Sequence, residues 1–167
     1  MNKLLKFLKI RRSIRSFKNK SIPKKRLEGI VDAARFAATA RNLQPWEFVV
    51  VTDKAKLNQL ALLAENGRFL AQAAACIVVF SSETKYYLED GSAATCNILL
   101  AATALGIGSC WIAGDKKAYA AEVSGLLNAA AGMKLISMVA LGYPAQRNAF
   151  GIMPKRGVNE MLHWEKF

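Results

Sequence analysis

A short basic segment near the N-terminus holds the residues best suited to binding an anion. Arg11, Arg12 and Arg15 lie close together in the sequence, with Ser13 between them. Guanidinium groups match the geometry of phosphate oxygens, and charge-assisted hydrogen bonds to phosphate are strong. The segment therefore indicates either a specific phosphate site or a solvated charged face, because short basic motifs have many false positives.

Residues for other kinds of catalysis are scarce. His163 is the only histidine, which leaves little for a His-based metal site or for Ser/His/Asp or Cys/His catalysis. The three cysteines, Cys76, Cys96 and Cys110, lie in apolar segments and have no metal-ligand spacing. We expect reduced thiols in the core of a cytoplasmic protein, and we expect no metal.

An uncharged stretch, residues 91–114, predicts the element around which the fold is organised. Its first part predicts a helix with apolar residues on nearly every face, which is typical of a buried helix. Gly106 and Gly108 then allow a tight turn, and residues 110–112 predict a short buried strand. A membrane span is the alternative, but the polar residues and the glycine break favour a helix of a soluble protein, covered by a second subunit.

The remaining pattern mixes amphipathic helices with apolar strands, which predicts one α+β or α/β sandwich domain over residues 1–167. Lysines interrupt the N-terminal leucines, so that we expect a short amphipathic helix there and no signal peptide. The other expected helices cover about 23–38, 54–64 and 115–127, with Asp53 and Asp115 as N-caps. Further strands are expected over 46–51, 75–80 and 135–141, the first of them central in the sheet. Residues 161–164 predict a final strand or an extended arm.

The formal charge of +12 indicates an anionic partner. Candidates are nucleic acid, an anionic membrane surface or a phosphorylated small ligand. A nucleic-acid-binding module is disfavoured, because the basic segment lacks aromatic interleaving and no recognition helix is evident. A hydrophobic fraction of 53 % indicates additional surface buried in an oligomer.

Four segments, taken in order, resemble the signature segments of the nitroreductase family. They are Arg11-Arg12-Ser13-x-Arg15, the run Asn-Leu-Gln-Pro-Trp-Glu-Phe at 42–48, the helix at 94–102 that runs into 105–112, and 140–144 followed by Lys155, Arg156 and 163–165. Each segment is weak evidence alone. Their order and spacing over nearly the whole chain make the resemblance specific, although many members carry Pro-Ser where this chain has Ala38-Thr39.

The resemblance implies a homodimeric FMN-dependent oxidoreductase with two flavins at the dimer interface and no nucleic-acid or membrane partner. It implies a three-layer α+β sandwich with a mostly antiparallel sheet, to which the partner's swapped C-terminal arm adds a strand. NADH or NADPH would deliver hydride to flavin N5, and a nitroaromatic or quinone-like acceptor would then be reduced at the same face in ping-pong fashion. The alternative is a flavin carrier, or a flavin-consuming protein, on the same fold.

The resemblance also assigns roles to individual residues. The flavin phosphate and the pyrimidine side of the ring are expected to contact Arg11, Arg12, Ser13 and Arg15. The other subunit is expected to line the flavin with Ala40, Arg41, Asn42 and Gln44. The segment beside the ring would be Trp111, Ile112, Ala113 and Gly114, with the Gly114 amide near N5 and Trp111 facing either the flavin or the core. Lys155 or Arg156 is expected to close on the phosphate.

Overall fold

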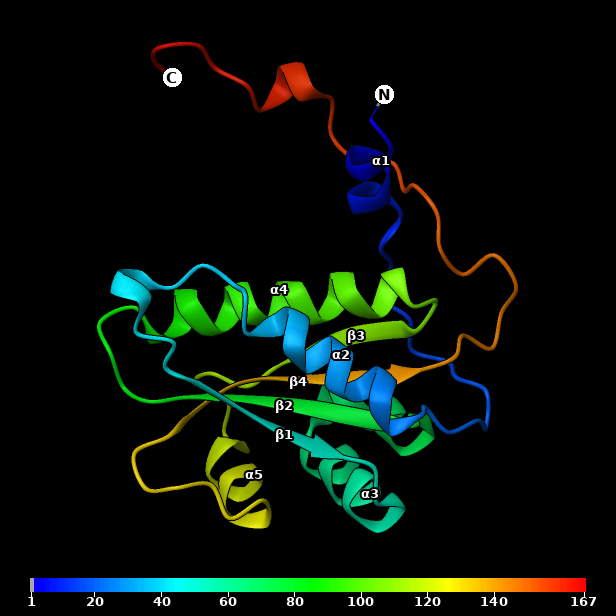
Figure 1. The fold of residues 1–167 in the computed structure, drawn as a ribbon, viewed down its shortest axis with the longest axis vertical. Helices are drawn as coiled ribbons and strands as arrows, with labels where there is room; N and C mark the ends of the chain where they lie inside the picture. Colours follow the sequence, from blue (N-terminus) through cyan, green and yellow to red (C-terminus); the bar gives the residue numbers. More distant parts are fainter. Residues whose placement is uncertain (1) are drawn as a thin grey trace.

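A four-stranded sheet forms the centre of the computed structural model, which describes residues 2–167 (Figure 1). The strands lie in the order β1-β2-β4-β3, and each neighbouring pair is antiparallel. Their bounds are β1 Trp46–Val51, β2 Ala75–Ser81, β3 Gly108–Ala113 and β4 Lys134–Gly142. The predicted α+β class with a mostly antiparallel sheet is therefore confirmed.

Helices cover both faces of the sheet, so that the body has three layers. Figure 1 shows α2 (Lys24–Ala34) and α4 (Tyr87–Ala104) on one side of the sheet, and α3 (Lys54–Leu63) and α5 (Ala120–Leu126) on the other. The N-terminal helix α1 (Lys3–Ile10) stands apart from these layers, and Met1 lies outside the described residues. Three short 3₁₀ helices complete the chain, η1 (Ala40–Asn42), η2 (Glu65–Gln72) and η3 (Val158–Glu160).

Strand β2 shows why these residues form a two-sided core. Successive side chains of a strand point to opposite faces. Accordingly Cys76, Val78 and Phe80 join the apolar cluster beneath α3 and α5, whereas the alternating residues Ile77 and Val79 join the cluster beneath α2 and α4. Every residue of β2 is buried, as expected for a strand covered on both faces.

Local capping fixes two of the helix ends. The Asp53 carboxylate accepts a hydrogen bond from the Lys56 amide at 2.9 Å, so the predicted N-cap of α3 is confirmed. Helix α2 ends at Ala34, earlier than predicted, where the Asn97 side chain donates to the carbonyl oxygen of Ala33 at 3.1 Å. That contact satisfies a helix-terminal carbonyl and ties α2 to α4.

Two expectations about the sheet and its caps are wrong. Strand β1 is an edge strand, not a central one, and its Val50 side chain is 40 % exposed. Asp115 does not cap α5, which begins at Ala120; its carboxylate instead accepts a hydrogen bond from the Tyr87 hydroxyl at 3.0 Å. The position of Asp115 in the sequence suited an N-cap, but its side chain binds Tyr87 of α4 instead.

Helix α4 is buried along most of its length but not all round. Its exposed or half-buried positions fall on one stripe that includes Glu89, Ala93, Cys96, Leu100 and Ala104. Cys96 is therefore exposed, which corrects the expectation that all three cysteines are core thiols, whereas the other two cysteines are buried and all three are free. No helix within residues 2–167 has both the length and the apolar character that a bilayer crossing requires.

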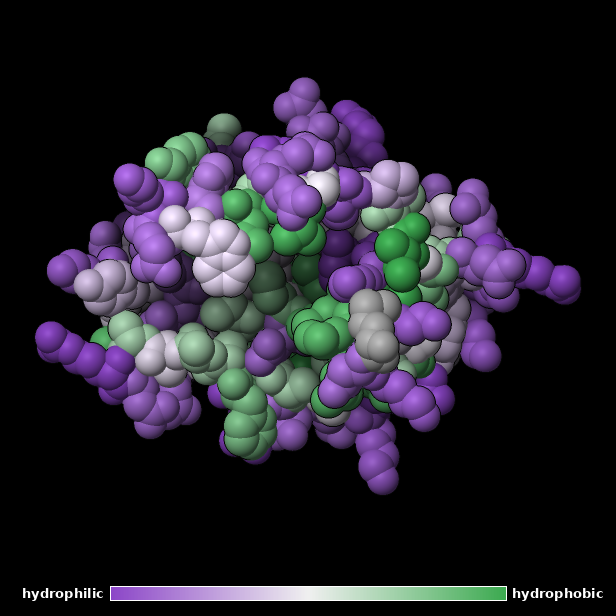
Figure 2. Space-filling view, turned by 90° about the horizontal axis from the view of Figure 1, so that it is seen from above, coloured by the Kyte–Doolittle hydropathy of each residue, from purple (hydrophilic) through white to green (hydrophobic). Residues whose placement is uncertain are grey.

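The C-terminal segment leaves the body as an extended arm and forms no strand of its own (Figure 1). It passes the end of α1, where the Gly151 amide donates to the carbonyl oxygen of Ile10 at 3.1 Å. Figure 2 views the side on which α1 and the arm project and shows apolar side chains gathered around a central hollow, with hydrophilic side chains outside them. Exposed apolar residues of α1 and the arm include Leu4, Leu8, Val158 and Trp164.

Candidate functional site

The basic segment is fixed against the open edge of β3. The amide of Ile14 donates to the carbonyl oxygen of Ser109 at 2.9 Å, and Ser13 forms a parallel bridge with Ser109. The Ile14 side chain packs directly on Gly108, where an added Cβ would lie 2.9 Å from Ile14 Cγ2. The missing side chain at Gly108 thus lets the segment approach the strand closely enough to present its arginines there.

Two pockets meet at Arg15. The first has a volume of about 340 Å³ and a predominantly polar wall, with Arg12, Ser13, Arg15, Ser16 and Gln146 among its residues. The second, of about 160 Å³, lies along β3, and its wall combines Arg15 with Asn66, Phe69, Lys117, Tyr119 and the run 110–113. The Arg15 guanidinium carbon lies 5.9 Å from the centre of the Phe69 ring. Arg15 therefore links a polar, basic pocket to a pocket beside the strand.

The register of β3 decides which of its amides face the second pocket. The Gly114 amide donates to the carbonyl oxygen of Ile136 at 3.0 Å, so it points into the sheet. Hydrogen-bonding direction alternates along an antiparallel strand, and the amides of Trp111 and Ala113 therefore point away from β4 towards the open edge. The Gly114 amide, expected near flavin N5, is thus engaged within the sheet, and the Ala113 amide one residue earlier faces the open edge.

Burial and positive charge act in opposite directions on the Cys110 thiol. Burial raises the pKa of Cys110, while the nearby charges of Arg15 and Arg11 and a hydrogen bond with Ser13 oppose that rise. Because its charge acts on this thiol, Arg11 lies near the same part of β3 as Arg15. Burial prevails, so Cys110 stays a neutral thiol near neutral pH and serves as packing beneath the arginines.

One buried polar atom at this site has no partner in the protein. The Ser109 side chain is 1 % exposed, and within residues 2–167 its Oγ makes no hydrogen bond. Buried hydroxyls are usually satisfied. Ser109 borders neither of the two pockets, so its hydroxyl marks a place where a buried water would be stabilised.

The predicted loop with Ala40, Arg41, Asn42 and Gln44 is tightly held by Asp90. The Asp90 carboxylate accepts hydrogen bonds from the Thr39 hydroxyl at 2.8 Å and from the Ala40 amide at 3.1 Å. The Thr39 Oγ in turn accepts from the Gln44 amide at 3.1 Å. Three loop residues adopt the left-handed conformation, with φ of 54° at Arg41, 56° at Asn42 and 50° at Gln44. Such conformations persist only where neighbouring contacts impose them.

The loop and the basic segment lie at opposite ends of α4 within one chain. Asp90 is in the first turn of α4, whereas Ser13 contacts the strand that follows its C-terminus. With a rise of 1.5 Å per residue, the helix separates them by about 20 Å. They also lie at opposite edges of the sheet, since the loop precedes β1 and the basic segment contacts β3 (Figure 1). A single chain does not bring the two halves of the predicted site together.

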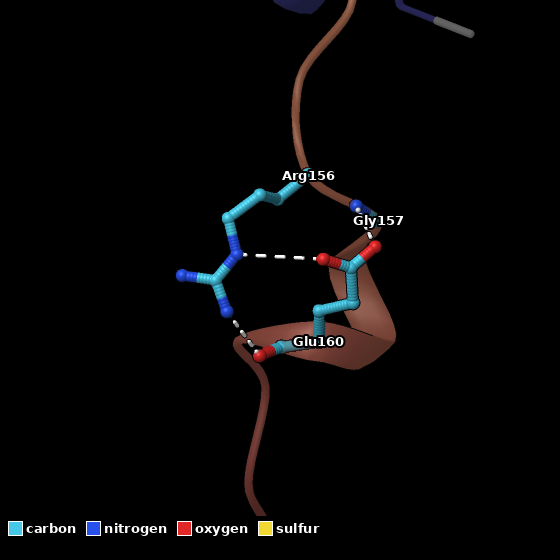
Figure 3. Close-up of polar contacts among 3 residues, drawn as sticks. All are labelled: Arg156, Gly157 and Glu160. Atoms are coloured by element: carbon cyan, nitrogen blue, oxygen red, sulfur yellow. Dashed lines mark hydrogen bonds and ion pairs between the residues drawn. The ribbon is translucent and has the colours of Figure 1, made fainter.

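Lys155 and Arg156 lie in the exposed arm. Figure 3 shows the Arg156 guanidinium turned towards Glu160, with Nε 3.4 Å from the carboxylate and the other nitrogen donating to the Glu160 carbonyl oxygen at 2.7 Å. The same carboxylate accepts from the Gly157 amide at 2.9 Å. Arg156 is thus occupied within the arm, whereas the Lys155 side chain is exposed.

The second pocket includes Trp111 and four residues that the sequence did not predict. The half-buried Trp111 side chain packs against the apolar cluster beneath α2 and α4, and Trp111 also borders the pocket along β3, so the structure keeps both expected roles open. Asn66, Phe69, Lys117 and Tyr119 join the second pocket through tertiary approach of η2 and the turn after β3. Nothing in their local sequence marks them as residues of a site. Within residues 2–167, no cluster of three or more His, Cys, Asp or Glu side chains is placed to bind a metal.

Comparison with known proteins identifies the class. The family model described as "Nitroreductase family" matches residues 8–74 and 62–143, and the chain belongs to that family. An Archaeoglobus fulgidus protein named "Putative NADH dehydrogenase/NAD(P)H nitroreductase" is 36 % identical over 174 residues, covering 100 % of both chains.

Two solved structures share the fold over almost their whole length. An FMN-dependent nitroreductase from Clostridium difficile has a TM-score of 0.89 and 30 % identity, covering 98 % of this chain and 99 % of that one. A protein from Desulfovibrio desulfuricans, described as a putative nitroreductase in complex with FMN, has a TM-score of 0.86 and 29 % identity, covering 100 % and 99 %. The resemblance inferred from the four sequence segments is confirmed.

Proposed function

We propose that this protein is an FMN-dependent oxidoreductase that uses NADH or NADPH to reduce nitroaromatic or quinone-like acceptors. The observation that carries the proposal is the position of Arg15, which joins the polar pocket to the pocket along β3. A phosphate on one side of this arginine and a planar ring on the other match the two ends of FMN. The FMN named for the two solved relatives supports the same cofactor here.

The residues present fit that group. Arg11, Arg12 and Ser13 would hold the phosphate, and Arg15 would face the pyrimidine side of the ring. The outward amides of Trp111 and Ala113 offer further polar contacts in the pocket along β3. When bound, FMN supplies hydride acceptance from the nicotinamide and electron delivery to the acceptor.

The chain itself contributes binding and charge to this chemistry. The Ala113 amide and the Arg15 cation would stabilise negative charge that develops beside β3. No protein acid or base is required of the pocket residues, and donor and acceptor would bind in turn at one open face. This alternation is the ping-pong order expected for the proposed activity.

A two-fold homodimer completes the site. If two copies of α4 pack antiparallel, the loop Ala40–Asn42 of one chain lies near the basic segment Arg11–Arg15 of the other. The dimer thereby brings together the two halves of the site, which lie about 20 Å apart within one chain. The stripe of α4 around Cys96 and the apolar side in Figure 2 supply the surface for such contact. Arg41, Asn42 and Gln44 would then approach the flavin from the partner.

The fold offers a surface to which the C-terminal arm of a partner chain would bind. A groove of about 720 Å³ runs between α2 and the open edge of β1, with Leu27, Val31 and Val50 in its wall. A strand added beside β1 would satisfy its unpaired backbone groups and cover Val50. The partner's arm carries suitable exposed apolar residues, among them Leu162 and Trp164.

A visible spectrum tests the proposed activity. We expect the protein loaded with FMN to show the bands of oxidised flavin and to lose them when NADH or NADPH is added without oxygen. Addition of a quinone should then restore the bands. Bands that persist with both nucleotides would favour the flavin carrier, and failure to retain FMN would contradict the proposal.

Cysteine cross-linking tests the dimer. Cys96 lies near the middle of α4, so two-fold packing of that helix places it close to its own copy. Burial raises the pKa of both Cys76 and Cys110, which leaves Cys96 as the accessible thiol. We expect a short bis-maleimide to yield a covalent dimer on a denaturing gel, and Cys96→Ser to abolish it. A wild-type dimer in solution that resists cross-linking at Cys96 would show that another face is used.

A further inference from the structure

We propose that Lys117 determines substrate specificity by binding the anionic group, a carboxylate or a phosphate, of a substrate at the rim of the pocket along β3, beside the flavin ring that this pocket is proposed to hold. This inference rests on the proposed oxidoreductase function and narrows its substrate class to anionic compounds. Lys117 belongs neither to the four segments that resemble the family nor to the residues proposed to hold FMN. Lys117 lines this pocket together with Arg15, but it is not part of the polar pocket assigned to the phosphate of FMN.

A tight turn after β3 sets the position of Lys117. Its amide donates to the carbonyl oxygen of Gly114 at 3.3 Å, and its own carbonyl oxygen accepts from the Ala120 amide at 3.0 Å. The Tyr119 hydroxyl donates to the carbonyl oxygen of Ala113, which ties the turn to the end of the strand. Lys117 therefore stands at the exposed rim of the pocket on an anchored backbone.

The charges around the pocket leave Lys117 available to an incoming anion. Its neighbour Lys116 lies 3.9 Å from the Asp115 carboxylate, and that carboxylate also accepts from Tyr87. Within residues 2–167, Lys117 forms no ion pair, and the pocket wall contains no Asp or Glu. With Arg15 and Lys117 as the charged side chains of its wall and the outward amides of β3 nearby, the pocket favours anions over neutral or cationic compounds.

Paired substrates and paired lysine variants test the proposal. Lys117→Gln removes the rim charge, and Lys116→Gln removes an equal charge one residue away that does not line the pocket. The FMN-loaded proteins would be titrated calorimetrically with 4-nitrobenzoate and with neutral 4-nitrobenzamide, and kcat/KM would be measured for both. In Lys117→Gln we expect the preference for the anion to fall by about two- to fivefold, the range of a solvent-accessible ion pair. Lys116→Gln should keep the wild-type preference.

The donor supplies a second arm, because the 2′-phosphate of NADPH is also an anion. If Lys117→Gln changes the ratio of kcat/KM for NADPH over NADH but leaves the nitrobenzoate preference intact, Lys117 binds the donor; the reverse result assigns it to the acceptor. An unchanged ratio in both arms, or an altered FMN affinity in Lys117→Gln, would overturn the proposal. An inactive wild-type protein would contradict the proposed function. The calorimetric titration would still test the role of Lys117, because binding is measured without turnover.

Discussion

Replacing Arg15 by alanine is expected to weaken FMN binding by about 10- to 100-fold and to abolish activity at limiting FMN. The guanidinium borders both pockets of the site, and a hydrogen bond to a charged group contributes about 1.5–3 kcal/mol, which corresponds to that loss in affinity. Quenching of FMN fluorescence during titration of the apoprotein measures the dissociation constant. Activity should return in part when FMN is added in excess.

The control for Arg15→Ala is Lys25→Ala, which removes an equal charge from an exposed position on α2. Because Arg15 is itself exposed, both variants should unfold at the wild-type temperature, so a weaker affinity in Arg15→Ala would report the site rather than the fold. Equal FMN affinities for wild type and Arg15→Ala would show that the cofactor does not lie between the two pockets.

The fold was predictable where local pattern and tertiary environment agree. The apolar runs that became β2 and β4 are buried on both faces, so their sequence alone identifies them. Strand β1 has the same kind of apolar run but lies at an edge of the sheet. Its apolar residues indicate that the strand is covered, but they do not indicate what covers it. In the proposed dimer the partner's arm covers β1, and a single sequence does not distinguish that arrangement from a central strand.

The candidate site was predictable only in part for a related reason. The arginines around Ser13 are marked by their composition, but Asn66 and Lys117 reach the pocket through the packing of distant segments. The direction of the Gly114 amide depends on the register between β3 and β4, which the sequence does not specify. The role of Asp115 was likewise decided by Tyr87, a contact across 28 positions of the chain.

Asp90→Ala is expected to destabilise the protein by about 2–4 kcal/mol and to weaken FMN binding through the loop that Asp90 holds. The carboxylate is only 5 % exposed and holds both the Thr39 hydroxyl and the Ala40 amide. Its removal leaves two half-buried donors without their acceptor, and a hydrogen bond to a charged group contributes about 1.5–3 kcal/mol. The left-handed residues Arg41, Asn42 and Gln44 would then relax, because Asp90 holds the Thr39 hydroxyl, and Thr39 in turn accepts from the Gln44 amide.

Urea unfolding and FMN titration measure the two effects of Asp90→Ala separately. Glu89→Gln serves as the matched control, since Glu89 is the exposed neighbour of Asp90 on the same turn of α4. Asp90→Asn retains one acceptor oxygen and should lie between wild type and Asp90→Ala. An alanine variant that unfolds like wild type would show that the loop does not depend on this carboxylate.

Mixed dimers of Arg15→Ala and Asp90→Ala chains distinguish a shared site from one built within a single chain. If each site combines Arg15 of one chain with the loop of its partner, a mixed dimer has one site with both defects and one site with neither. Co-expression with two affinity tags should therefore yield mixed dimers that bind FMN tightly at one site and recover activity that both parent variants lack. If each site were built within one chain, every site in the mixed dimer would carry a defect and no activity would return. The separation of about 20 Å along α4 favours recovery.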